Sequence, residues 1–98
     1  MEASFGDPAL DRLETDARFD GGYSPGVVKA YRKRMQQIRA AEDERAFYAL
    51  KSLHFEKLKG NREHQHSMRL NDQWRLILQL MGAGEDKRVH IVAIEDYH

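Results

Sequence analysis

Apolar residues recur at helical spacing in the first half of the chain and in short extended runs in the second half. The clearest helical stripe has intervals of mostly three and four residues, and it predicts one helix with a buried face. Ser24-Pro25 marks the start of this helix, because serine caps helices well and proline fits the first helical position. The stripe consists of Val27, Val28, Tyr31, Met35 and Ile38.

The remaining pattern predicts an antiparallel sheet after the helices. Residues 74–80 are apolar on both faces of a strand, which predicts a central position. Asp7-Pro8 predicts the start of an earlier helix that ends near Ala17. The other expected elements are a short edge strand at 1–5, a short helix or turn at 43–50, extended segments at 53–58 and 66–70, and a last strand at 88–95. This order predicts an α+β domain with two or three N-terminal helices on one face of a small, mostly antiparallel sheet.

Composition narrows the class of protein. A chain of 98 residues is expected to form one domain, spanning residues 1–98. It has no cysteine, which excludes disulfides and thiolate metal sites. No apolar stretch approaches the ~20 residues that a membrane span requires. The acidic N-terminus lacks the basic and then apolar pattern of a signal peptide, so a cytoplasmic location is expected.

The net charge of zero hides an uneven distribution. The first twenty residues are acidic, whereas two later segments are basic. A polyanion responds to the local field, so the overall charge argues neither for nor against RNA binding. Such runs are most often solvated helix faces. The basic residues are Lys29, Arg32, Lys33, Arg34 and Arg39 in one segment, and Lys51, Lys57, Lys59, Arg62, Arg69 and Arg75 in the other.

Four short motifs occur in a fixed order along the chain. They are Leu53-His54, Leu58-Lys59-Gly60-Asn61-Arg62, Ser67-Met68-Arg69-Leu70-Asn71-Asp72-Gln73-Trp74-Arg75 and Glu95-Asp96-Tyr97-His98. No single motif is specific, but the ordered set with its terminal Asp-Tyr-His is. In this set, and in a Ser4-Phe5 pair before a helix, the chain resembles the HigB, or plasmid maintenance killer, branch of the RelE-like toxins.

The resemblance implies a compact RelE-like fold and a specific activity. Members of the family are small bacterial endoribonucleases, and most of them cut messenger RNA in the ribosomal A site. The implied reaction is attack of the ribose 2′-OH on phosphorus, without metal or other cofactor. The implied partner is a HigA-like helix-turn-helix antitoxin, and operator DNA would be bound only indirectly through that antitoxin.

The resemblance also assigns roles to particular residues. His54 and His98 are the expected acid and base, since imidazole titrates near neutral pH; which is the acid stays open. Asp96 is expected to orient an imidazole, and Tyr97 to stack on a base or donate to a phosphate. Lys59 and Arg75 are expected to stabilise phosphoryl charge. The residues expected to bind RNA are Lys57, Arg62 and Arg69.

Other functions are open on the sequence alone. The family often has its Leu-His and Leu-Lys-Gly motifs closer together, whereas Phe55-Glu56-Lys57 intervenes here. This spacing motivates an alternative in which the domain binds an antitoxin or RNA without cutting. A DNA-binding regulator is less favoured, because Gly21-Gly22 follows an acidic helix rather than joining a helix-turn-helix pair. His64 and His66 share a strand face, but no third metal ligand accompanies them.

Overall fold

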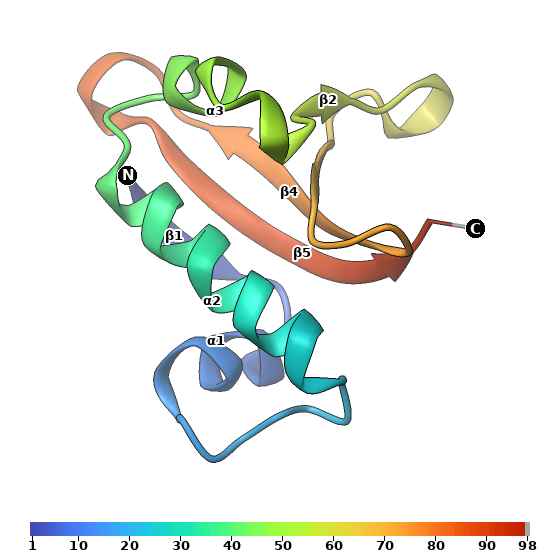
Figure 1. Ribbon diagram of the computed structural model, residues 1–98. Helices are drawn as coiled ribbons and strands as arrows, with labels where there is room; N and C mark the ends of the chain where they lie inside the picture. The colour runs from blue at the N-terminus through green and yellow to red at the C-terminus, as the bar shows by residue number, and fades with distance from the viewer. Residues whose placement is uncertain (98) are drawn as a thin grey trace.

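A five-stranded sheet in the order β1-β5-β4-β3-β2 is the frame of the fold (Figure 1). The computed structural model describes residues 1–97. β1 pairs with β5 in parallel and every other pairing is antiparallel. The α+β class, the edge position of the first strand and the central position of β4 are therefore confirmed. The strands are β1 (Glu2–Phe5), β2 (Glu56–Lys57), β3 (His66–Arg69), β4 (Trp74–Met81) and β5 (Arg88–Asp96).

The two long helices begin at the predicted signals. The Asp7 side chain accepts a hydrogen bond from the Ala9 amide at 2.8 Å, and Ser24 Oγ accepts one from the Val27 amide at 3.4 Å. In both helices the residue after the cap is proline. The helices are α1 (Pro8–Thr15), α2 (Pro25–Ala40) and α3 (Arg45–Ala49), with single 3₁₀ turns η1 (Lys51–Leu53), η2 (Gly60–Arg62) and η3 (Gly84–Asp86).

The core lies between α2 and one face of the sheet, across which α2 runs in Figure 1. Every member of the predicted helical stripe is buried. From β4, Leu76 and Leu78 point into this core. The buried Tyr31 hydroxyl donates to the Leu10 carbonyl at 2.7 Å, which satisfies its polar end and ties α2 to α1.

The segment at 53–58 corrects the prediction of a continuous extended run. Leu53 ends η1, His54 has a left-handed backbone with φ of +47°, and only Glu56–Lys57 forms a strand. Leu53 and Phe55 are both buried, which gave the sequence its strand-like alternation. Side-chain packing instead favours a turn at His54, because this turn brings the Phe55 ring to 5.3 Å from that of Phe47 in α3.

A β-bulge in β5 changes which face its later side chains occupy. Leu78 pairs with Ile91 and Ile77 pairs with Ala93, so Val92 is an extra residue in β5. Before the bulge, Val89 and Ile91 face the core, and after it Ile94 does. Glu95 consequently lies on the opposite face of the sheet, beside its cross-strand partner Arg75.

His66 provides a test of pH dependence in this fold. Its ring stacks on Phe55 at 4.7 Å, and Nδ1 is buried without a hydrogen-bond partner among the described residues. Burial, and secondarily the charge of Lys57, lower the pKa of His66 from its usual 6.5, although Glu44 opposes this. Protonation is therefore less favourable in the folded state than in the unfolded state, and the free energy of unfolding should fall as pH drops below about 6.5.

The measurement is urea unfolding between pH 7 and pH 5 for the wild type and His66→Phe. Phenylalanine keeps an aromatic ring beside Phe55 but does not titrate, so the variant should lose less stability on acidification. Equal losses in the two proteins would show that His66 does not contribute to the pH dependence.

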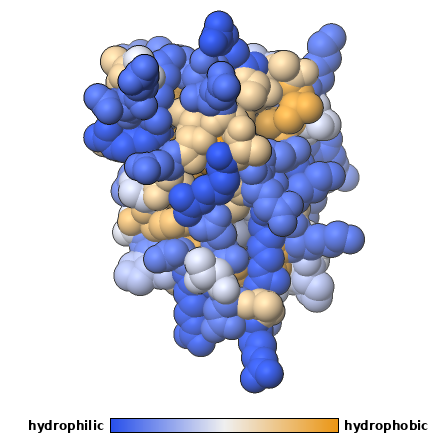
Figure 2. Space-filling view, turned by 90° about the vertical axis from the view of Figure 1, so that its left-hand side faces the viewer, coloured by the Kyte–Doolittle hydropathy of each residue, from blue (hydrophilic) through white to orange (hydrophobic). Residues whose placement is uncertain are grey.

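Viewed from the left-hand side of Figure 1, the surface is mostly hydrophilic, with apolar side chains gathered in its upper part (Figure 2). Exposed large apolar side chains include Leu50, after α3, and Met81, at the end of β4. Within residues 1–97, no helix has both the length and the apolar character needed to cross a membrane.

Candidate active site

The candidate site lies on the sheet face opposite α2, here called the site face. Three charged residues form one row across it: Arg69 of β3 pairs with Arg75 of β4, which pairs with Glu95 of β5. The adjoining row contains Ser67 and Ile77, and both are almost completely buried. Charged side chains thus lie beside a small buried floor formed by one polar and one apolar residue.

A cavity of about 200 Å³ opens over these rows. Four residues predicted to act in the site line it, although they come from separate segments of the chain. This convergence brings the η2 turn, β4 and the C-terminal end of β5 together. The lining residues are Leu58, Arg62, Ser67, Arg75, Ile77, Glu95, Asp96 and Tyr97.

Arg62 spans the site from the η2 turn to β5. Its two terminal nitrogens donate to the two carboxylate oxygens of Glu95 at 3.0 and 2.8 Å, and its Nε donates to Gln65 at 3.0 Å. A bidentate pair of this kind fixes both partners in direction as well as distance. Arg62 therefore crosses the site face with its guanidinium paired to a carboxylate, in an ion pair that is still partly exposed to solvent.

Arg75 is held against the chain's penultimate residue. Its guanidinium carbon lies 4.2 Å from the centre of the Tyr97 ring, and Nη1 donates to the carbonyls of Asn71 and Trp74 at 2.7 and 3.2 Å. Within residues 1–97, Nη1 is the only nitrogen of the Arg75 guanidinium that donates a hydrogen bond. Nε and Nη2 can therefore donate to an anion in the cavity, which suits a phosphate oxygen.

The C-terminal end of β5 is tied to the turn before β4. The Tyr97 amide donates to the Gln73 carbonyl at 2.7 Å, and Gln73 Nε2 donates to an Asp96 carboxylate oxygen at 2.9 Å. These bonds hold Asp96 and Tyr97 in place near a chain end. His98, predicted to act in catalysis, lies outside the described residues.

The other predicted residues do not line the cavity. His54, Lys57 and Lys59 are exposed. Lys57 is the cross-strand partner of His66, and this pairing places Lys57 on the α2 side of the sheet. Arg69 lies in the charged row, but its side chain forms an ion pair with Asp72. The site thus carries acidic as well as basic groups, in contrast to a uniformly cationic groove.

Sequence reasoning missed Glu95, although this residue stood inside the terminal motif. An even offset of two residues from Tyr97 places both side chains on one face of a strand, and that was the available signal. Ser67 and Ile77 of the cavity floor gave no such signal. In the described part of the chain, no group of three or more His, Cys, Asp or Glu side chains is arranged to hold a metal ion.

Comparisons with known proteins identify the family and the fold of the chain. Residues 3–98 match the family model described as the RelE-like toxin of the type II toxin-antitoxin system HigB. A YoeB/ParE toxin from Agrobacterium tumefaciens is similar in structure, with a TM-score of 0.65, 18% identity and full coverage of both chains. A YoeB-YefM complex from Staphylococcus aureus gives a TM-score of 0.63 at 19% identity, covering 100% of this chain and 97% of the other. No curated protein sequence matched the chain.

Proposed function

Because the chain belongs to the HigB-like family of RelE-like type II toxins, we propose that it is a metal-independent endoribonuclease that cleaves messenger RNA in the ribosomal A site. The observation that carries this proposal is the cavity that gathers Arg62, Arg75, Asp96 and Tyr97 on the site face. A cavity of about 200 Å³ accommodates a phosphate and part of one nucleotide, not a folded RNA. The proposed substrate is therefore single-stranded RNA.

The chemistry follows from the groups at the cavity. In-line attack of the 2′-OH oxygen forms the new phosphorus–oxygen bond and breaks the bond to the leaving 5′-oxygen. Arg75 supplies donors for the phosphoryl oxygens, whose charge increases in the transition state. Tyr97 is fixed beneath Arg75 and offers its exposed ring or hydroxyl to the nucleotide. The products are a 2′,3′-cyclic phosphate and a 5′-hydroxyl.

The two proton transfers are assigned to histidines by resemblance. His98 follows the anchored Tyr97 directly, and His54 is exposed in a left-handed backbone conformation. A base must accept the 2′-OH proton and an acid must protonate the 5′-oxygen. Asp96 orients an imidazole through its carboxylate. Lys59, Arg62 and Arg69 are proposed to contact the RNA backbone around the cavity, with Lys59 also near the phosphoryl charge. Lys57, on the α2 side of the edge strand β2, is proposed to contact RNA that continues beyond the cavity.

The proposed partner is a HigA-like helix-turn-helix antitoxin. The structurally similar YoeB is found in a YoeB-YefM complex, which supports a protein partner for the present chain as well. Operator DNA would be reached through the antitoxin, and the proposed location is the cytoplasm.

The test is to map cut ends on a translated message. Purified wild-type protein and His98→Ala are added to a bacterial translation extract, and 5′ ends are sequenced with and without prior kinase treatment. New ends should require the kinase, because they carry a hydroxyl, and His98→Ala should lose about 100-fold or more in cleavage rate, as expected for loss of a general acid or base.

Two controls check ribosome dependence and the fold of the variant. The same message without ribosomes should remain intact, which checks ribosome dependence. Circular dichroism should show that His98→Ala keeps the fold. Wild-type protein that binds the message or an antitoxin but produces no ends would favour a non-catalytic binding module. Full activity in His98→Ala would refute the acid–base assignment.

A further inference from the structure

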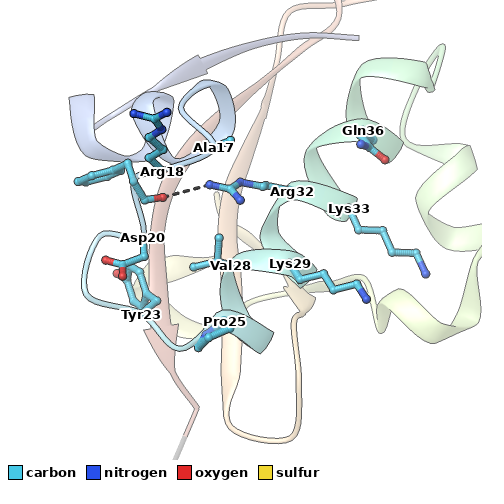
Figure 3. Close-up of a pocket in the computed structure, with 11 residues that line it drawn as sticks. Ala17, Arg18, Asp20, Tyr23, Pro25, Val28, Lys29, Arg32, Lys33 and Gln36 are labelled. Atoms are coloured by element: carbon cyan, nitrogen blue, oxygen red, sulfur yellow. Dashed lines mark hydrogen bonds between the residues drawn. The ribbon is translucent and has the colours of Figure 1, made fainter.

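A second, larger cavity lies outside the candidate active site, and the two cavities share no lining residue. It has a volume of about 590 Å³ and is formed between the loop after α1 and one side of α2. This volume is within the range of ordinary ligand sites. Its apolar surface comes from Ala17, Phe19, Pro25 and Val28, as shown in Figure 3 for the labelled members. The loop and helix belong to the α2 side of the sheet, opposite the site face.

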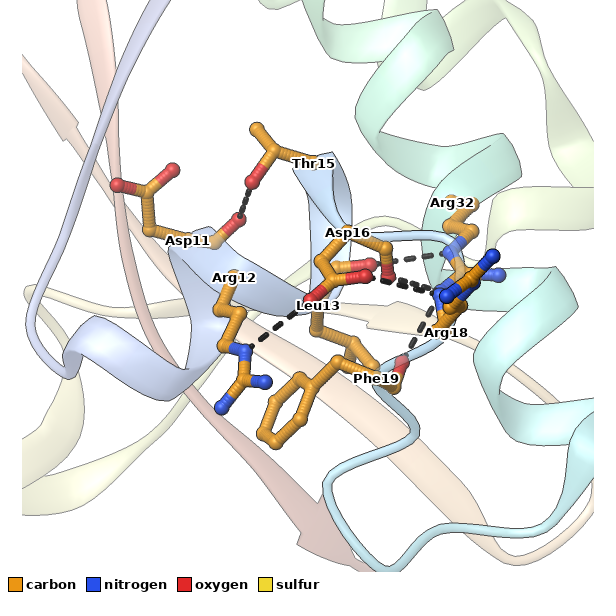
Figure 4. Close-up of polar contacts among 8 residues, drawn as sticks. All are labelled: Asp11, Arg12, Leu13, Thr15, Asp16, Arg18, Phe19 and Arg32. Carbon is orange, nitrogen blue, oxygen red and sulfur yellow. Dashed lines mark hydrogen bonds and ion pairs between the residues drawn. The ribbon is translucent and has the colours of Figure 1, made fainter.

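The loop is held in position by Arg32 of α2. Its guanidinium donates three hydrogen bonds of 3.0 Å, to the carbonyls of Leu13, Asp16 and Phe19 (Figure 4). Asp16 adds an acceptor for the Arg18 amide at 3.0 Å, and this bond contributes most to lowering the pKa of Asp16. The wall of the cavity is thus preorganised, and an occupant would not have to order it.

The cations around the cavity differ in what they contact. The Arg32 guanidinium already donates to the loop carbonyls. Lys29 and Lys33 instead extend from the neighbouring flank of α2, away from the loop (Figure 3). Both lysines are exposed. An occupant that enters the cavity and continues across α2 would therefore pass from an apolar surface to two positive charges.

The aromatic residues of the cavity already contact neighbouring side chains, which reduces the ring surface that a nucleobase could use. Arg12 covers one face of Phe19, with its guanidinium carbon 4.3 Å from the ring centre. Tyr23 is engaged edge-on with Trp74 at 5.8 Å. Stacking on single-stranded RNA requires free aromatic faces. Asp20 also lines the cavity and repels a continuous phosphate backbone, but a peptide can place its carboxylates selectively.

We propose that this cavity is a docking site for an acidic peptide segment of a protein partner. One large apolar side chain of the segment fills the space over Phe19 and Val28, and flanking carboxylates pair with Lys29 and Lys33. The apolar anchor supplies most of the affinity, and the charges select the partner. This binding is independent of RNA cleavage, because it uses no residue of the candidate active site.

The experiment is a selection of randomised 12-residue peptides on the full-length protein, followed by NMR titration of the peptides that are enriched. Enriched sequences should combine several Asp or Glu with one large apolar residue. Amide shifts should centre on the cavity residues from Ala17 to Gln36. The double variant Lys29→Glu/Lys33→Glu should bind these peptides about tenfold or more weakly, as expected when rim charges are reversed.

A matched control carries the same change in charge elsewhere. Lys51→Glu/Arg88→Glu alters two exposed cations that do not line this cavity, and it should bind the peptides within about twofold of wild type. The proposal fails if no acidic peptide is enriched, if both double variants bind equally, or if the shifts map elsewhere. Tighter binding of a 12-nucleotide single-stranded RNA at the same residues would also overturn it, in favour of a nucleic-acid site. None of these readouts depends on catalysis.

Discussion

Replacing Arg75 by alanine is expected to reduce message cleavage about 100- to 1,000-fold, the usual cost of removing one preorganised donor to a developing oxyanion. The expectation rests on geometry. The Arg75 guanidinium is fixed by the Tyr97 ring and by two backbone carbonyls, and its remaining donors can reach a phosphate in the cavity. The measurement is the initial rate of cleavage in a translation extract with a defined message.

Two further variants separate this role from charge in general. Arg75→Lys keeps the positive charge but loses the planar fork, and it should recover only part of the activity. Arg88→Ala removes an exposed arginine at the far end of β5, outside the candidate active site, and should cleave at nearly the wild-type rate. Cleavage by Arg75→Ala within about threefold of wild type would exclude Arg75 from transition-state stabilisation.

The elements that were predictable are those in which local pattern and tertiary packing agree. The stripe of α2 and the two capped starts appear in the structure as expected, because each follows from side-chain spacing or from one local hydrogen bond. The run at 53–58 failed for the opposite reason. Its alternation of Leu53 and Phe55 satisfies a strand, but the rings of Phe47 and His66 hold Phe55 through tertiary contacts that alternation does not encode.

The residues of the site could be predicted from the sequence, but the sheet face on which each side chain lies could not. The motif order identified Arg62, Arg75, Asp96 and Tyr97, which meet at one cavity. The β5 bulge was not visible in the sequence, and strict alternation from Val89 and Ile91 would have placed residue 95 on the core face. One extra residue reverses that assignment.

The ion pairs of the site have a consequence for how it binds RNA. Glu95 holds Arg62 through two hydrogen bonds, so a phosphate must compete with a carboxylate already in place. Arg75 has no such acidic partner among its hydrogen bonds in residues 1–97. This difference makes Arg75, rather than Arg62, the residue preorganised to receive the phosphoryl group.

Replacing Leu78 by alanine is expected to have the largest effect on stability. Leu78 lies in the central strand β4, is fully buried, and belongs to the core against α2. Truncation of such a side chain removes apolar burial and leaves a cavity, at a cost of about 2–5 kcal/mol. In a domain of this size each kcal/mol lowers Tm by about 4–8 °C, so a loss of at least about 8 °C is expected.

Leu50→Ala is the matched control, since it deletes the same atoms from a side chain that is 43% exposed. Its free energy of unfolding should stay within about 1 kcal/mol of wild type, because less apolar area leaves water there on folding. Urea unfolding of both variants measures the difference directly. Equal destabilisation would mean that the core does not lie where β4 meets α2, and the sheet face now assigned to the active site would lose its structural basis.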